Sequence, residues 1–340
     1  MYFFYLLKKY LKNFFIVFIG VSFLYTIVSM LFSISKLPSS SNLVVLYLFY
    51  LFIYSALLLY PLSIIFSFLI TLNQMIKFNE LVSFYALGFS PKKIFKPFFI
   101  SAFLITLFML FLQSTKLAYS NEYAQAIKDL RKLTTKNIFL KYQNKIVYIK
   151  QLNPVLKVAN YISVFDMKDN TLNKVIFAKK AVFKKDVWVS KKATIIFINK
   201  KRWQKEVTNL VFLKNFKPKI LSNLQKLRDI SLYDAYLIVK YFKDIDLNTI
   251  LSMVFFKIFT PLSILALMFY IFITAPIHIR LSNITVFMIK SISLSILVWG
   301  GELILYKFAK QGVIPFWSLS LIFIILLIID IYAIRRVNEF

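Results

Sequence analysis

The sequence lacks cysteine altogether and contains a single histidine, His278. The absence of cysteine excludes a disulfide, a thiolate nucleophile and a cysteine-ligated metal. One histidine argues against both a histidine cluster for a metal and a Ser-His-Asp triad within this chain. An exported domain of this protein must therefore be held together by packing alone.

Glycine is also scarce, with five residues in 340. No G-x-x-x-x-G-K-[ST] sequence occurs, so the chain carries no P-loop for ATP. If ATP drives this protein, a separate subunit must bind it. Two of the five glycines are adjacent, at Gly300 and Gly301, where they would let another helix or a lipid chain approach closely.

Acidic residues are few as well, with 14 Asp and Glu against 43 Lys and Arg and a net charge of +29. Such a balance would suggest nucleic acid in a soluble chain. Here 59% of the residues are apolar, and they gather in runs that reach the roughly 20 residues needed to cross a bilayer. We therefore predict a membrane protein without a nucleic-acid partner, whose basic excess is mostly surface charge and otherwise suits an anionic membrane or ligand.

The apolar runs predict six membrane spans in two groups of three. Before the first span, residues 1–12 combine aromatic residues with lysines and predict a short amphipathic helix at the interface. The predicted spans cover residues 13–35, 43–72, 94–113, 250–274, 282–306 and 313–333.

The segment between the two groups differs in character. Residues 114–249 hold 28 basic and 10 acidic residues and no run of membrane length. Apolar and polar residues alternate along several runs, which predicts antiparallel strands, and helices are expected at 116–133 and 228–249. The predicted fold class is an α+β membrane protein with an inserted, jellyroll-like β domain, organised as residues 1–113, 114–249 and 250–340.

Basic residues are distributed unequally between the two sides of the predicted membrane. Ten lie in short loops on the side of both termini, and three lie on the other side. The positive-inside rule then places both termini in the cytoplasm and the β domain in the periplasm, with the chain in the inner membrane.

Residues 74–88 interrupt the apolar pattern between the second and third spans. Apolar residues recur there every three or four positions, which predicts an amphipathic helix on the cytoplasmic side. Gly88 is placed to end this helix, and Pro91 prevents its easy continuation.

Two interpretations of this helix remain open at this point. It could rest on lipid, or it could insert into a groove of a cytoplasmic ATPase as a coupling helix. Glu80 favours the second, because an acid among basic residues gains nothing from anionic lipid but could pair with an arginine of a partner. Phe78, Leu81 and Phe84 would then supply the buried apolar anchor.

Lys257, Lys290 and Glu302 are charged residues that lie within apolar spans. Charge there is costly, so we expect these side chains to face a cavity, a partner or a lipid ligand. The alternative is that they extend to the interface, which is strongest for Glu302 near the outer end of its span. Lys36, at the outer end of the first span, could hold a lipid phosphate or serve as a topology anchor.

The segment from Asn79 to Ser90 reads N-E-L-x(4)-A-L-G-F-S. Together with the architecture of three spans, a β domain and three spans, it resembles the YjgP/YjgQ permeases, LptF and LptG of the lipopolysaccharide transport system. The stretch 231–241 (SLYDAYLIVKY) is similar to the segment that leads into the fourth span in this family, and it favours LptG over LptF.

The resemblance implies a permease that pairs with a second LptF/LptG-type subunit around a lipid cavity. A dimer of the ATPase LptB would engage the coupling helices, and lipopolysaccharide would pass through the jellyroll domains to LptC and a periplasmic bridge. Glu80 matches the coupling-helix acid of the family, and Lys36 lies where the family places basic residues that meet lipid phosphates. No cofactor is implied on this chain, and ATP is used by the partner subunit.

Three other classes of membrane protein fit the sequence less well. A secondary transporter would require broken helices and buried acids at mid-membrane, and no acidic pair is evident there. A scaffold or mechanotransmitter subunit of another ABC-type complex usually has four spans. A membrane enzyme would need a Ser-His or acid-pair constellation that the spans lack.

Overall fold

The computed structural model describes residues 2–38, 40–128, 135–142, 145–153, 158–168, 171–184, 187–197, 203–214, 230–241, 247–278 and 283–338. The chain divides into two compact units. The first, here called the helical unit, comprises Met1–Ser35, Leu48–Asn121 and Asn248–Phe340, and the second, the sheet unit, comprises Lys36–Tyr47 and Glu122–Leu247.

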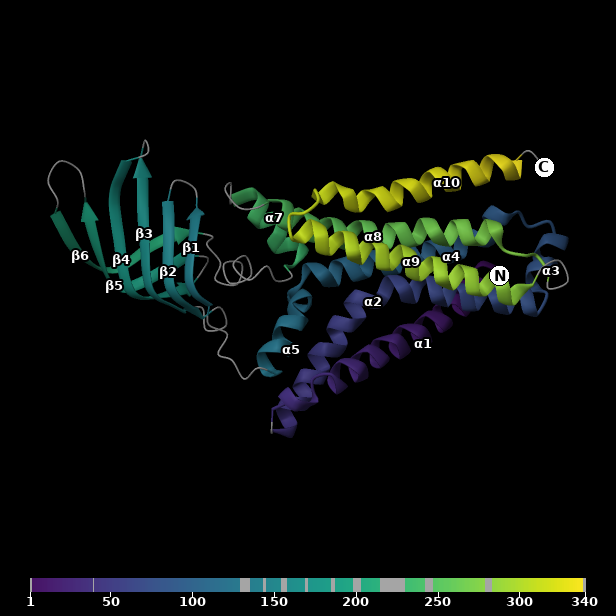
Figure 1. Ribbon diagram of the computed structural model, residues 1–340, viewed down its shortest axis with the longest axis horizontal. Helices are drawn as coiled ribbons and strands as arrows, with labels where there is room; N and C mark the ends of the chain where they lie inside the picture. The colour runs from purple at the N-terminus through teal and green to yellow at the C-terminus, as the bar shows by residue number, and fades with distance from the viewer. Residues whose placement is uncertain are drawn as a thin grey trace. The chain divides into compact units, whose positions relative to one another are not determined.

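Six helices are long and apolar enough to cross a membrane, as the sequence predicted. They are α1 (Tyr2–Leu31), α2 (Ser41–Lys77), α4 (Pro91–Ser114), α8 (Leu247–Thr274), α9 (Ile284–Lys310) and α10 (Leu321–Asn338), which follows the short helix η3 (Phe316–Ser320) (Figure 1). The shorter helices are η1 (Ile34–Lys36), α3 (Glu80–Ala86), η2 (Lys116–Tyr119), α5 (Ser120–Lys128) and α7 (Leu232–Tyr241).

The start of α1 differs from its prediction. Residues 2–12 continue into the first span as one helix, and Leu6 and Tyr10 are both 0% exposed. Residues 2–12 are therefore not a separate short helix. One side of these first turns is buried in the protein, so this segment belongs to the core of the helical unit.

Aromatic side chains bring four of the long helices together. Phe68 of α2 contacts Phe98 of α4 with ring centroids 5.6 Å apart, and Tyr10 of α1 lies 6.0 Å from Phe98. Phe272 of α8 closes the cluster against Phe95, at 5.2 Å. Tilted and edge-on ring pairs of this kind stabilise beyond their burial, so this cluster is the centre of the unit's packing.

A glycine allows α9 and α10 to approach each other closely. A Cβ atom on Gly301 of α9 would lie 3.3 Å from Cδ1 of Ile322 in α10, whereas one on Gly300 would meet nothing within 4 Å. Within the chain, the close approach that the sequence suggested for the pair is therefore seen at Gly301.

Three segments that are far apart in the sequence lie at the same end of the helical unit. Figure 1 places the start of α1, the end of α10 and α3 at one end. Since α4 follows α3 and runs to the other end, the chain leaves for the sheet there and returns at the start of α8. The sheet segment is thus inserted between α4 and α8, as the sequence predicted.

The sheet unit contains six described strands in the order β1-β2-β3-β4-β5-β6, each antiparallel to the next. They are β1 (Thr135–Tyr142), β2 (Lys145–Asn153), β3 (Val158–Lys168), β4 (Thr171–Lys184), β5 (Val187–Phe197) and β6 (Trp203–Lys214). Neighbours in sequence are thus neighbours in space, which makes the described part a meander rather than a pair of Greek keys. The α+β class with an inserted antiparallel sheet is confirmed.

The alternating pattern decides which face of the sheet is buried. Ile149 of β2 pairs with Ile162 of β3, and Val147 with Val164, and all four are at most 1% exposed. Because successive strand residues point to opposite faces, their neighbours point the other way. Trp188 of β5, 0% exposed, is the largest side chain of this apolar face.

Candidate functional site

The predicted helix over 74–88 is two elements in the structure. Residues 74–77 are the last turn of α2, and α3 begins only at Glu80, after Asn79 takes a left-handed conformation with φ 60°. Asparagine tolerates this region better than most residues, so it accommodates the break. The apolar period continues across the break because Met75 at the end of α2 and Leu81 in α3 both face the core.

Gly88 ends α3 as predicted from its position. Its φ of +77° is the left-handed conformation common after helices. The Gly88 amide donates to the Tyr85 carbonyl at 2.9 Å, and the Phe89 amide donates to the Phe84 carbonyl at 3.0 Å. The turn is therefore closed by backbone hydrogen bonds, and α4 can start at Pro91.

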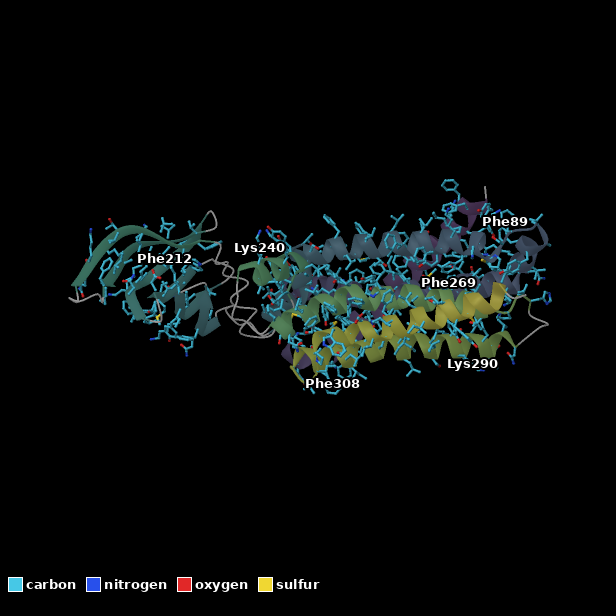
Figure 2. All side chains as sticks on the ribbon, turned by 90° about the horizontal axis from the view of Figure 1, so that it is seen from above. Phe89, Phe212, Lys240, Phe269, Lys290 and Phe308 are labelled. Carbon is cyan, nitrogen blue, oxygen red and sulfur yellow. The ribbon has the colours of Figure 1, made fainter. Side chains whose placement is uncertain are left out.

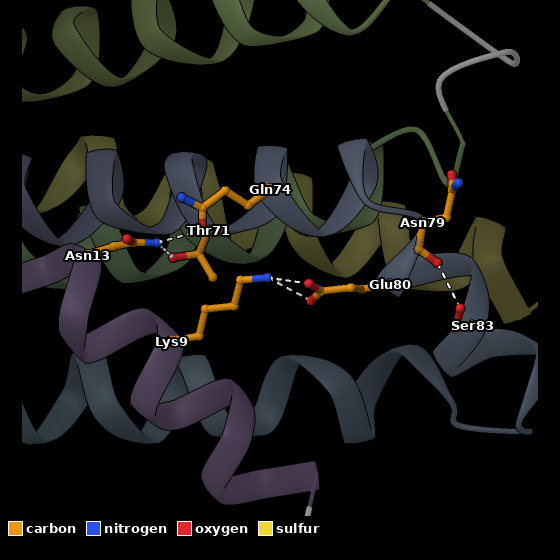
Figure 3. A network of polar contacts seen from close by, with 7 residues as sticks. All are labelled: Lys9, Asn13, Thr71, Gln74, Asn79, Glu80 and Ser83. Carbon is orange, nitrogen blue, oxygen red and sulfur yellow. Dashed lines mark hydrogen bonds and ion pairs between the residues drawn. The ribbon is translucent and has the colours of Figure 1, made fainter.

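Glu80 is held by a lysine 71 positions earlier in the chain. Lys9 Nζ of α1 donates to both carboxylate oxygens, at 2.6 and 2.7 Å (Figure 3). The two side chains are 17% and 24% exposed, so water only partly screens the pair. A charge-assisted bond to both oxygens fixes the position of the α3 start relative to α1.

The next turn of α1 is tied to α2 by further polar contacts. Asn13 Nδ2 donates to Thr71 Oγ1 at 2.8 Å and to Gln74 Oε1 at 3.2 Å, as Figure 3 shows. The Tyr10 hydroxyl donates to the Ile64 carbonyl at 3.2 Å. The first turns of α1 are thus bound to α2 by buried hydrogen bonds and to α3 by an ion pair.

An aromatic contact holds the other end of α3. The ring of Tyr2, at the start of α1, lies 4.5 Å from the ring of Phe89, and Phe89 also meets Phe84 edge-on at 5.7 Å. Since Lys9 contacts the first residue of α3 and Tyr2 contacts the turn after it, α1 holds both ends of this helix.

The apolar residues predicted as an outward anchor are divided by the structure. Leu81 is 1% exposed and packs in the core, and Phe84 is half-buried against it. Phe78 is 67% exposed, as an anchor requires, and Leu87 is exposed to 73%. The outward apolar pair is therefore Phe78 and Leu87. Leu87 was missed, although its place just before the helix-ending Gly88 takes it off the buried face.

Two of the lysines predicted to bind lipid lie on different helices, and their role stays a prediction. Lys257 is half-buried in α8, whereas Lys290 is exposed near the start of α9. Lys290 and Glu302 are twelve residues apart on α9, about 18 Å along the helix. The side chain of Lys36 lies outside what the structure describes, so its role stays a prediction.

Glu302 does not extend to the interface, contrary to the alternative considered from its position. Its side chain is 0% exposed, and Oε1 accepts a hydrogen bond of 2.8 Å from Ser263 Oγ of α8. Oε2 is buried and has no hydrogen-bond partner among the described residues. The carboxyl group therefore joins α8 to α9 within the membrane-spanning part of the protein.

A second buried acid, Asp330, was missed because the predicted span ended only three residues later. In the structure α10 runs on to Asn338, and Asp330 is 5% exposed. Among the described residues, no group of three or more His, Asp and Glu side chains could hold a metal ion.

The sequence profile described as lipopolysaccharide export system permease LptF/LptG matches residues 4–336. The match spans both groups of spans and the inserted sheet. A search of curated proteins gives no match. The profile covers LptF and LptG together, so the preference for LptG remains a prediction.

The hydrogen bond between Ser263 and Glu302 can be tested by a double-mutant cycle. We expect Ser263→Ala and Glu302→Leu to be less than additive in thermal unfolding of the detergent-solubilised protein, with a coupling of about 0.6–1.7 kcal/mol. Ser252→Ala, which removes another fully buried serine of α8, should be additive with Glu302→Leu. Full additivity of Ser263→Ala and Glu302→Leu would contradict the bond.

Proposed function

The chain belongs to the LptF/LptG family of lipopolysaccharide export permeases, and from that premise we propose that it extracts lipopolysaccharide from the inner membrane and passes it to a periplasmic bridge. The driving ATP is hydrolysed by a separate, LptB-like ATPase dimer. The complete exporter also includes a paired LptF/LptG-type permease and an LptC-like protein. Both termini and α3 lie in the cytoplasm, and the sheet unit lies in the periplasm, in agreement with the distribution of basic residues.

The observation that supports this proposal is that the α3 segment exposes apolar side chains and a carboxylate. It lies at the same end of the helical unit as the start of α1 and the end of α10 (Figure 1). Phe78 and Leu87 project their apolar side chains into solvent, where an exposed apolar pair favours a protein partner. Glu80 keeps a quarter of its surface exposed and retains lone pairs beyond those that Lys9 uses, so it can also accept from a cation on the ATPase.

Force applied to α3 would reach the membrane through α1. The Lys9–Glu80 ion pair and the Tyr2–Phe89 contact join the two helices at both ends of α3. Because α1 is one continuous helix from Tyr2 to Leu31, a displacement of its first turns moves its whole membrane span. We propose that this is how nucleotide-driven motion of the ATPase narrows the lipid cavity.

The lipid cavity is formed between α1 and α9 of this chain and their counterparts in the paired permease. The most apolar 18-residue windows of α1 and α9 are each only 17% buried, against 56% for α8 at the centre of the unit. Exposed apolar faces suit both acyl chains and a partner helix. Transfer of a lipid to water costs about 0.8 kcal/mol per exposed CH₂, so the acyl chains must stay shielded along the path.

The sheet unit offers the next shielded surface. One face of the sheet is apolar, from Ile138 in β1 to Trp188 in β5. Basic side chains are abundant in the same segment and can attract the phosphorylated sugars of the lipid. An apolar face for acyl chains beside a basic surface for phosphates matches both parts of the cargo.

A charge swap separates the two roles of Glu80. Glu80→Lys should lose co-purification with the ATPase, because it removes the acid and places two lysines together. Lys9→Glu combined with Glu80→Lys restores an internal ion pair and should recover the resistance of α1 to limited proteolysis while ATPase binding stays lost. Full recovery of ATPase binding by the swap would show that Glu80 only positions α3.

Photo-crosslinking tests the cargo and its path. A crosslinking residue at Ile19 of α1 or Leu297 of α9 should capture lipopolysaccharide in an ATP-dependent manner. The matched controls, Leu104 of α4 and Ile328 of α10, are as exposed as these two positions and should capture phospholipid. Capture of phospholipid alone at all four positions would argue for another cargo.

A further inference from the structure

The described residues form a cavity of about 730 Å³ between the last turns of α8 and the first three turns of α9. It lies at the α3 end of the helical unit, since α8 runs towards that end and α9 starts from it (Figure 1). The export path proposed above does not use this cavity.

Lys290 lines this cavity and has an unmet charge. It makes no hydrogen bond or ion pair with any residue that the structure describes, and its side chain is exposed. It is six residues from the first residue of α9, about 9 Å along the helix, and Figure 2 places it towards the same end as Phe89. An anion beside this lysine would lower the cost of placing its charge within a membrane span.

The cavity is lined by both apolar and polar side chains. Ile271, Phe287 and Leu294 supply apolar surface, while Asn283 and Ser291 add polar groups beside Lys290. Asn283 Oδ1 accepts from the Thr285 and Val286 amides, at 3.0 and 3.3 Å, which leaves its amide nitrogen free to donate. A cation and an amide donor beside an apolar wall match a phosphate attached to an acyl chain.

We propose that this cavity holds an anionic phospholipid of the leaflet on the α3 side, with its phosphate on Lys290 and an acyl chain along α8 and α9. A zwitterionic lipid brings its own ammonium group, which competes with Lys290 for the phosphate. A lipid with a net negative headgroup, such as phosphatidylglycerol, neutralises the lysine. The first turns of α9 add partial positive charge to the same place.

The bound lipid contacts a helix that is central to the packing of the unit. Ile271 lines the cavity, and the next residue, Phe272, contacts Phe68 of α2 and Phe95 of α4. An occupied cavity therefore supports α8 on the side opposite its aromatic contacts. The inference requires only that α9 crosses the bilayer and is independent of the identity of the exported lipid.

The test uses the full-length protein in phosphatidylcholine nanodiscs that contain a phosphatidylglycerol with a photoreactive group beside the phosphate. We expect the probe to label peptides within 270–294 about fivefold more than a phosphatidylcholine probe does, as the gain of one lysine–anionic lipid contact implies. Lys290→Gln should remove this preference and Lys290→Arg should keep it. Lys307→Gln, which removes an exposed lysine from the other end of α9, should leave labelling within about twofold of the wild type.

Several results would overturn the inference. Equal labelling by the two probes, or an equal loss in Lys290→Gln and Lys307→Gln, would show that Lys290 does not select the headgroup. Displacement of the probe by millimolar inorganic phosphate would identify a site for a soluble anion. Displacement by lipopolysaccharide, but not by unlabelled phosphatidylglycerol, would identify the cavity as part of the export path. In each case the crosslinks from α1 and from Leu297 remain a separate measure of export.

Discussion

The ion pair between Lys9 and Glu80 is the contact on which the proposed action of this protein depends. It joins the start of the short helix α3 to α1, a helix long enough to cross the membrane. Exposed ion pairs stabilise little, but this pair uses both carboxylate oxygens and is partly buried. The aromatic contact between Tyr2 and Phe89 adds a second attachment, so α3 cannot move far without α1.

The membrane-spanning helices form a tightly packed centre and also have exposed apolar faces. Aromatic packing around Phe68 and Phe98 holds α1, α2, α4 and α8 together, and Glu302 joins α8 to α9 through Ser263. Most of the apolar surface of α1 and α9 is left uncovered by the residues that the structure describes. In the proposed export mechanism, the packed centre would transmit a displacement and the exposed apolar faces would carry lipid, so different residues would meet these two requirements.

Features that depend on residues close together in the sequence were predicted, whereas contacts between distant residues were not. Six spans and an alternating β segment follow from local periodicity, and both are confirmed. The break at Asn79 was missed because Met75 and Leu81 keep one apolar face across it. The partners of Glu80 and Glu302 were also missed, since Lys9 and Ser263 are 71 and 39 positions away. No local pattern encodes such distant pairs, and burial of Leu81 depends on the same distant packing.

The most direct test of the central claim is the distance between α1 and α3 during the ATPase cycle. The chain has no cysteine, so spin labels can be placed on Phe4→Cys and Ser83→Cys without background. Both positions are exposed, at the α3 end of the helical unit. In the assembled, ATPase-bound exporter, the account predicts the same distance distribution without nucleotide and with ATP trapped. A shift between these two states would show that α3 moves independently of α1 and would contradict the account.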